Sequence, residues 1–157
     1  MRSSVVLAFV IAAATSSAYA ENARIVLPTA GRLIAPSALA PLLIKPCSRR
    51  GAVGAESFWE PTEAQLNVLE AKLIAFLKSQ PSDVSPPART SYHRQYAGFV
   101  KAGRRYIYGS FYAARGKMTQ AERDRPIGVC DGGPAFWGVV YDLESGEFSD
   151  LALNPVI

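Results

Sequence analysis

Apolar residues recur at three- and four-residue steps between residues 66 and 77, and this spacing predicts an amphipathic helix. The apolar stripe consists of Leu66, Leu69, Leu73, Phe76 and Leu77. Thr62 and Gln65 have the spacing of a capping box, in which each side chain accepts a hydrogen bond from the free backbone N–H of the other residue. Pro81 ends the pattern, because proline cannot continue a helix. We therefore expect one helix between Thr62 and Pro81, buried along its apolar stripe.

After a proline-containing connection over residues 81–90, the period changes from helical to two. Residues 92–100 and 104–112, with a turn at 101–103, predict one hairpin, and residues 136–141 and 148–153 predict a second hairpin around 144–146. The polar segment 113–128 between them predicts an exposed connection with a helical turn near 119–123. One amphipathic helix packed on a four-stranded antiparallel meander is an α+β domain of two layers, and we expect this fold class.

The residues before the helix form a different kind of segment. Residues 21–57 contain apolar stretches that prolines interrupt, at Pro28, Pro36, Pro41 and Pro46. This punctuation predicts an irregular arm with at most a short strand or helical turn. Together with the helix and sheet over residues 58–157, the arm is expected to form a single domain over residues 21–157.

Cys47 and Cys130 are the only cysteines of the chain. In an oxidising compartment, two cysteines far apart in sequence predict a disulfide, which would tie the arm to the rest of the domain. The alternatives are a metal-binding pair and a catalytic thiol. With a single histidine in the chain, few further ligands remain for a metal that prefers sulfur and imidazole. We expect no metal and no cofactor.

The first twenty residues have the pattern of a cleavable signal peptide. A positive start at Arg2 precedes an apolar run over residues 5–14, and Ala18-Tyr19-Ala20 places small residues where signal peptidase cleaves. The run is short of the roughly 20 residues of a membrane-spanning helix, which disfavours the alternative of a stable membrane anchor. We therefore expect a mature chain that begins at Glu21 and is periplasmic or secreted. The net charge of +4 predicts only weak attraction to anionic surfaces, and no nucleic acid is expected as a partner.

Tyrosine and arginine are concentrated in the first predicted hairpin. The residues of this group are Tyr92, Arg94, Tyr96, Arg105, Tyr106 and Tyr108. Tyrosine and arginine supply contact area and directed hydrogen bonds at protein interfaces, so the group is a candidate binding face. The alternative is structural, because tyrosines also suit a half-buried pleated surface and arginines its rim.

Two further features could carry chemistry. The glycine-rich turn that begins at Asp131 and leads to Trp137 is either a forced turn or the wall of a small pocket. His93 could act as a general base oriented by Asp131 or Glu147, but the sequence offers no nucleophile motif beside it. The carboxylates of loop 142–147 depart from the spacing of a calcium loop. We assign no catalytic residue.

Several short sequence strings, taken in their order along the chain, resemble those of a known group of proteins. They are Arg94-Gln95-Tyr96-x-Gly98, Arg105-x-Ile107-Tyr108, Cys130-Asp131-Gly132-Gly133, Phe136-Trp137-Gly138-Val139 and Phe148-Ser149-Asp150-Leu151. From Trp59 onward, the chain resembles an uncharacterised family of small exported bacterial proteins. The resemblance implies a bacterial protein of the cell envelope and transfers no activity.

Taken as a sequence, the chain is most consistent with a non-enzymatic interaction protein of the periplasm, such as an inhibitor or an immunity-type binder. Its expected partner is another envelope or secreted protein. Two alternatives stay open: a hydrolase that acts on an envelope polymer, and a structural envelope component. Convergence of His93, Asp131 and a carboxylate in one cleft would favour the hydrolase.

Overall fold

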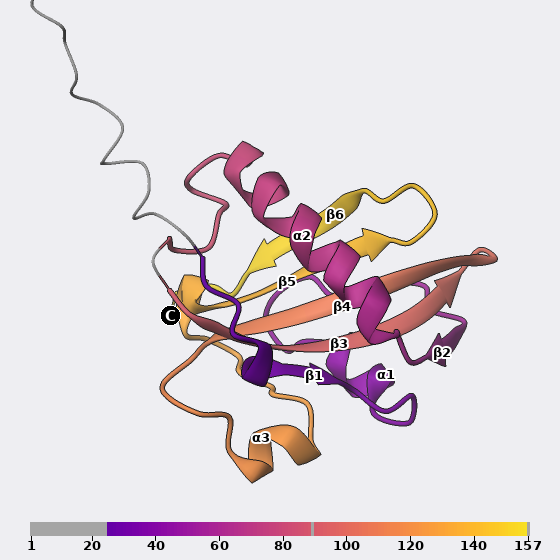
Figure 1. Ribbon diagram of the computed structural model, residues 1–157, viewed down its shortest axis with the longest axis horizontal. Helices are drawn as coiled ribbons and strands as arrows, with labels where there is room; N and C mark the ends of the chain where they lie inside the picture. Colours follow the sequence, from indigo (N-terminus) through magenta and orange to yellow (C-terminus); the bar gives the residue numbers. More distant parts are fainter. Residues whose placement is uncertain (1–24, 89, 157) are drawn as a thin grey trace, which may run out of the picture.

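The computed structural model describes residues 25–88 and 90–156, so the predicted signal peptide over residues 1–20 lies outside the described residues. Within them, a six-stranded sheet carries one long helix, α2 (Glu63–Ser79), on one face (Figure 1). The connections contain two short α-helices and two 3₁₀ helices, namely α1 (Ala40–Leu43), α3 (Gln120–Asp124), η1 (Thr29–Gly31) and η2 (Gly133–Ala135). The domain is therefore α+β, as predicted. Across the described ranges, no helix combines the length and apolar character needed to cross a membrane.

Four long antiparallel strands form the body of the sheet. They are β3 (Tyr92–Lys101), β4 (Arg104–Ala113), β5 (Phe136–Asp142) and β6 (Phe148–Leu153), and each matches its predicted range to within one residue. The expectation of a four-stranded, purely antiparallel sheet is nevertheless wrong. Two strands of the arm, β1 (Arg32–Ile34) and β2 (Ser57–Trp59), also join the sheet, and β1 pairs in parallel with β3.

Both strands of the arm lie along β3. β1 runs beside the start of β3, with Arg32 opposite Arg94, and β2 runs beside its end, with Trp59 opposite Gly98. A Cβ atom at position 98 would lie 2.5 Å from the Trp59 ring, so the absence of a side chain at Gly98 lets the indole lie on the strand. Each strand has three residues, which is too short for an alternating pattern to be recognised in the sequence.

Helix α2 covers the first face of the sheet, and its position follows from its apolar stripe. The Thr62 capping box is present with both predicted hydrogen bonds. The four buried leucines of the helix pack on side chains from β3, β4 and β5, namely Tyr92, Tyr96, Ile107, Phe111, Trp137, Val139 and Tyr141. At the centre of this layer, the rings of Phe111 and Trp137 stack with centroids 3.8 Å apart.

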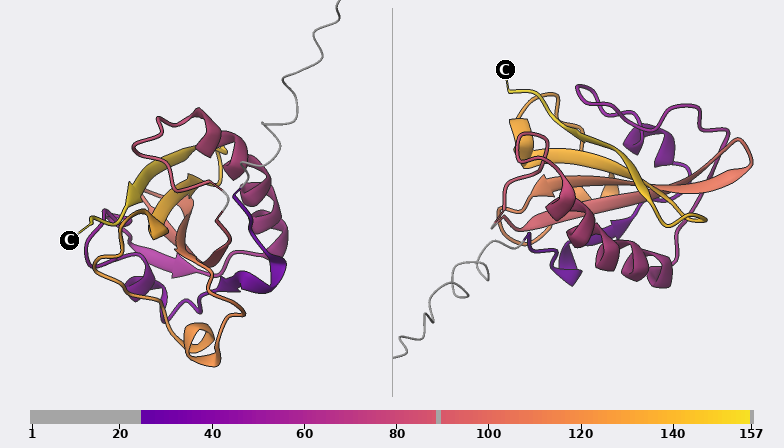
Figure 2. Two further views of the ribbon diagram at one scale, coloured as in Figure 1. Left: turned by 90° about the vertical axis from the view of Figure 1, so that its left-hand side faces the viewer. Right: turned by 90° about the horizontal axis from the view of Figure 1, so that it is seen from above.

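The second face of the sheet is covered by the arm. Buried arm residues, Ala35, Ala40, Leu43, Ile44 and Ala52, pack on Ala97, Phe99, Tyr108 and Val140 of the sheet. When the molecule is seen from above, α1 and α2 lie on opposite sides of the strands (Figure 2). The arm is thus a third layer of the domain, and the two-layer arrangement that the sequence predicted is incomplete.

A disulfide joins Cys47 of the arm to Cys130, which precedes η2 and β5. The pairing is the one predicted from the sequence. Both cysteines are exposed, and their Cα atoms are 5.0 Å apart. The bond fastens the arm, a few residues after α1, to the segment that leads into η2 and β5.

The packing of α2 gives a first testable expectation. Leu73 is fully buried, and its replacement by alanine leaves a cavity, so Leu73→Ala should lower the free energy of unfolding by about 2–5 kcal/mol. The neighbouring Lys72 is exposed, and Lys72→Ala should change the free energy of unfolding by no more than about 0.5 kcal/mol. Urea unfolding followed by circular dichroism measures both. Equal losses in the two variants would contradict the packing of this helix.

Candidate functional site

The tyrosine and arginine residues of the first hairpin do not share one exposed face. Tyr92, Arg94 and Tyr96 project under α2, and Tyr108 projects under the arm. All four side chains are fully buried. Only Arg105 is exposed, and Tyr106 is half-buried. A partner that docks on the folded domain cannot reach four of the six residues. Their concentration in the hairpin thus agrees with the alternative, structural interpretation.

Arg94 belongs to a buried ion pair with α2. Its Nε and Nη2 atoms each donate to a carboxylate oxygen of Glu70 at 2.9 Å, and Nη1 donates to the carbonyl of Pro28. The Tyr96 hydroxyl donates to the same carboxylate at 3.0 Å. Burial, and then the Glu70 charge, hold the pKa of Tyr96 well above its usual value. A second arginine, Arg32, lies 3.5 Å from Glu70. The cluster pairs the polar ends of Arg94 and Tyr96 with Glu70 of the helix, so its role is to join α2 to the sheet.

Tyr108 and its neighbours on the second face are held by Arg49 of the arm. The Arg49 guanidinium donates to the Tyr108 hydroxyl at 3.2 Å, to Ser110 Oγ at 2.8 Å and to Asn154 Oδ1 at 2.7 Å. Each of the three guanidinium nitrogens makes one of these bonds. The remaining two residues of the hairpin lie at its tip, where Arg105 stacks over the Trp59 ring at 5.4 Å and Tyr106 stacks on Phe99.

The glycine-rich turn has a structural role in this fold. Gly132 has φ = +86°, a left-handed conformation that favours glycine, and the carbonyl of Asp131 accepts a hydrogen bond from Asn154 at 2.7 Å. Trp137 is fully buried in the core under α2, whereas Asp131 is exposed. The two residues predicted to line a small pocket therefore face different environments and do not form one.

His93 is not placed for the hydrolase alternative. It is 5% exposed, and it pairs with Tyr112 across the hairpin, which in turn is level with Phe136 at the start of β5. Glu147 follows the other end of β5, so it lies too far along the sheet to orient the imidazole. Asp131 is exposed, and within the described residues the buried His93 Nδ1 has no hydrogen-bond partner. Neither carboxylate therefore orients the imidazole through this atom.

Asp142, the first carboxylate of loop 142–147, is engaged in the turn itself. Asp142 Oδ1 accepts hydrogen bonds from the backbone N–H groups of Glu144 at 2.9 Å and Ser145 at 3.2 Å, and Oδ2 pairs with Arg104 at 2.6 Å. Burial opposes ionisation of Asp142, but these donors outweigh it, so its pKa lies below the usual value. Among residues 25–88 and 90–156, no group of three or more metal-binding side chains could hold an ion.

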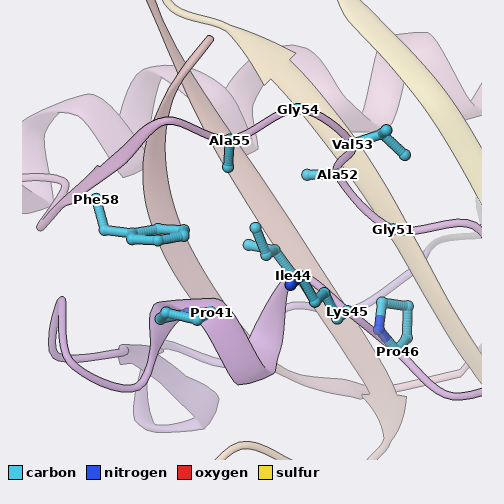
Figure 3. Close-up of a pocket in the computed structure, with 10 residues that line it drawn as sticks. All are labelled: Pro41, Ile44, Lys45, Pro46, Gly51, Ala52, Val53, Gly54, Ala55 and Phe58. Carbon is cyan, nitrogen blue, oxygen red and sulfur yellow. The ribbon is translucent and has the colours of Figure 1, made fainter.

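The arm, which covers the second face of the sheet, contains a solvent-accessible hollow of about 520 Å³. It lies between the end of α1, the loop over residues 51–55 and β2 (Figure 3). Pro41, Ile44 and Phe58 provide apolar walls, and Lys45 is the charged residue of the lining. The sequence analysis missed it, because the hollow is made by the way the arm folds over the sheet and not by a motif. The prolines and glycines of this stretch were its only signal.

A second hollow of about 160 Å³ lies on the other side of the same loop. Ala52 and Val53 line both hollows, and the second is completed by Phe99, Lys101, Tyr106, Val140, Ser149 and Asp150. Val53 is 70% exposed where the two hollows meet. We call this surface, formed by both hollows and Val53, the arm surface.

Comparison of the chain with protein-family models, with curated proteins and with solved structures finds no match.

Proposed function

We propose that the protein is an exported, soluble binder of the periplasm, of the inhibitor or immunity type, and that it contacts its protein partner through the arm surface. The observation that carries the proposal is the large apolar hollow of the arm, which the exposed side chain of Val53 borders. Bulky side chains that enter such hollows contribute most of the affinity of many protein interfaces. The exposed disulfide, which suits an oxidising compartment, supports the export of the protein.

The charges around the arm surface indicate what kind of partner fits. Lys45 and Lys101 are exposed. The acidic residues here are Asp150, which lines the second hollow, and Glu56, which accepts a hydrogen bond from the backbone N–H of Ala102 at 2.9 Å. Arg50 is also exposed and lies 3.6 Å from Asp150. The balance at this surface is positive, so a partner with an acidic surface and a protruding apolar side chain complements it in both charge and shape.

The rest of the domain serves this surface as a scaffold. Arg49 and the disulfide hold the arm against the sheet. Ile44 packs among the buried residues between the arm and the sheet and also lines the hollow. A surface held in place before binding loses less conformational entropy on association. The binder therefore needs the disulfide and the arm as much as the sheet.

Replacing Val53 with aspartate should weaken capture of the partner by about tenfold, or roughly 1.4 kcal/mol. Val53 is 70% exposed, so the free energy of unfolding should change by no more than about 0.5 kcal/mol. The measurement is capture from a native periplasmic extract by the immobilised protein, quantified by mass spectrometry across a series of variants.

The matched control is Val68→Asp, because Val68 is 53% exposed on α2, on the other side of the sheet. A protein retained by the native chain and by Val68→Asp, but lost with Val53→Asp, is a partner of the arm surface. Its binding should weaken as salt is raised, because screening reduces the attraction of Lys45 and Lys101. Equal capture by both variants would refute the assignment of this surface.

A further inference from the structure

The start of β3 and the end of β4 carry a buried group of polar side chains on the second face of the sheet. At the start of β3, the side chains of His93 and Gln95 project toward the second face, and Tyr112 of β4 lies opposite His93. All three are buried, with exposures of 5%, 1% and 5%. The corresponding side chains on the first face make an aromatic core under α2. On the second face, by contrast, His93, Gln95 and Tyr112 lie beneath the connection between β4 and β5, and we call these three side chains the polar floor.

Two groups of this floor lack hydrogen-bond partners. Within the described part of the chain, neither His93 Nδ1 nor the Tyr112 hydroxyl has a partner, although both atoms are buried. The two rings lie edge to face with centroids 5.4 Å apart. A buried polar group without a partner costs about 1–3 kcal/mol. Two such groups side by side therefore point to a site where a ligand supplies the missing bonds.

The segment that covers this floor is weakly held. Residues 114–129 carry α3, every residue of which is exposed or half-buried, and α3 projects from the body of the domain (Figure 1). Its main attachments are the buried side chain of Met118 and the amide of Gln95, which bonds to the carbonyls of Glu122 and Arg125 and to the backbone N–H of Ile127. The two ends of the segment are fixed, by β4 and by the disulfide at Cys130. Segments with few buried apolar contacts open at the lowest free energy.

We propose that residues 114–129 form a gate that opens over a binding site made of His93, Gln95 and Tyr112, and that the site takes a neutral, hydroxylated ligand such as a sugar unit. This site is separate from the arm surface and does not depend on the proposed function. When the gate lifts, the Gln95 amide loses its three backbone partners and faces the opening with the imidazole and the phenol.

The chemistry of the floor selects the class of ligand. An imidazole, an amide and a phenol each can donate and accept hydrogen bonds, and a hydroxyl group of a ligand does the same. Burial, and then the charge of Glu122, hold the pKa of Tyr112 above its usual value, so the phenol stays protonated and neutral. The polar floor contains no lysine or arginine, and Arg49 donates its hydrogen bonds to Tyr108, Ser110 and Asn154, so the open floor holds none of these cations to pair with an anionic ligand. Because the two rings are perpendicular, one of them can lie flat on the apolar C–H face of a sugar while the other meets the edge of the sugar.

The single histidine of the chain makes the opening measurable. In the mature, untagged, disulfide-bonded protein, diethyl pyrocarbonate should modify His93 at a rate that hardly changes with urea below the unfolding transition. Amides of residues 114–129 should exchange hydrogen at least tenfold faster than those of α2. Gln95→Ala should speed modification at least tenfold, whereas Gln80→Ala, which alters a half-buried glutamine at the end of α2, should not. Should Gln95→Ala fail to fold, the urea dependence of the native chain decides the matter.

Maltotriose is the neutral probe, and glucuronate is the charged one. We expect maltotriose to slow the modification of His93 in a saturable way, and glucuronate to have no effect at the same concentration. The inference is overturned if His93 reacts only with the urea dependence of global unfolding, because no gate then exists. It is equally overturned if the gate opens but maltotriose gives no protection, or if only glucuronate protects. None of these outcomes bears on capture of a protein by the arm surface.

Discussion

Replacing Arg94 with alanine is expected to lower the free energy of unfolding by about 3–5 kcal/mol, because the change leaves the Glu70 carboxylate without its main partner in a buried site. Arg94 is fully buried, and both of its bonds to Glu70 measure 2.9 Å. The Tyr96 hydroxyl depends on the same carboxylate. Urea unfolding followed by circular dichroism measures the loss.

Arg105→Ala is the matched control for this experiment. Arg105 lies in the same hairpin, but it is exposed and makes its principal contact by stacking over Trp59. Its removal should cost no more than about 1 kcal/mol. Capture of the partner, measured per folded molecule, should be unchanged by Arg94→Ala. If instead Arg94→Ala kept full stability and lost binding, the hairpin would be the working surface and the arm surface would be misassigned.

Removing the disulfide is the second change with a large expected effect. Cys47 and Cys130 are 83 residues apart, and a cross-link that closes so long a loop restricts the unfolded chain strongly. Cys130→Ser should therefore lower the free energy of unfolding by about 2–5 kcal/mol. Thermal unfolding of oxidised protein, compared with the variant under identical conditions, measures the difference.

Two controls separate the cross-link from the loss of a side chain. Cys47→Ser should destabilise as much as Cys130→Ser, and the double variant no more than either, since each change removes the same bond. The variants should also capture less partner, because the bond holds the arm that forms the hollow. A double variant as stable as the native protein would show that the arm is held by packing alone, through residues such as Ile44 and Leu43.

These expectations share a single structural cause. The core of the domain encloses several tyrosines and the fully buried Arg94. Glu70 accepts hydrogen bonds from Arg94 and Tyr96, and Arg49 donates one to Tyr108. Residue types that are common at interfaces are here used inside the protein. The surface left for a partner is formed by the arm, which has short elements and an apolar hollow.

The local pattern of the sequence was sufficient for the elements with a long period. The helix between Thr62 and Pro81 follows from its leucine spacing and capping box, and the structure confirms both. The four long strands follow from alternation over six to ten residues. The disulfide follows from the presence of two cysteines alone. In each case a local rule, the periodicity or the cysteine count, is enough.

The tertiary structure alone decided which of these residues are accessible. Alternation shows that Tyr92, Arg94 and Tyr96 share a face, but it cannot show whether that face meets a helix, the arm or solvent. Here α2 covers one face and the arm covers the other, so both sets of side chains are buried. The three-residue strands β1 and β2 exist only because β3 offers them backbone partners. The hollow of the arm and the polar floor beneath α3 depend in the same way on contacts between segments far apart in the chain, which no local pattern encodes.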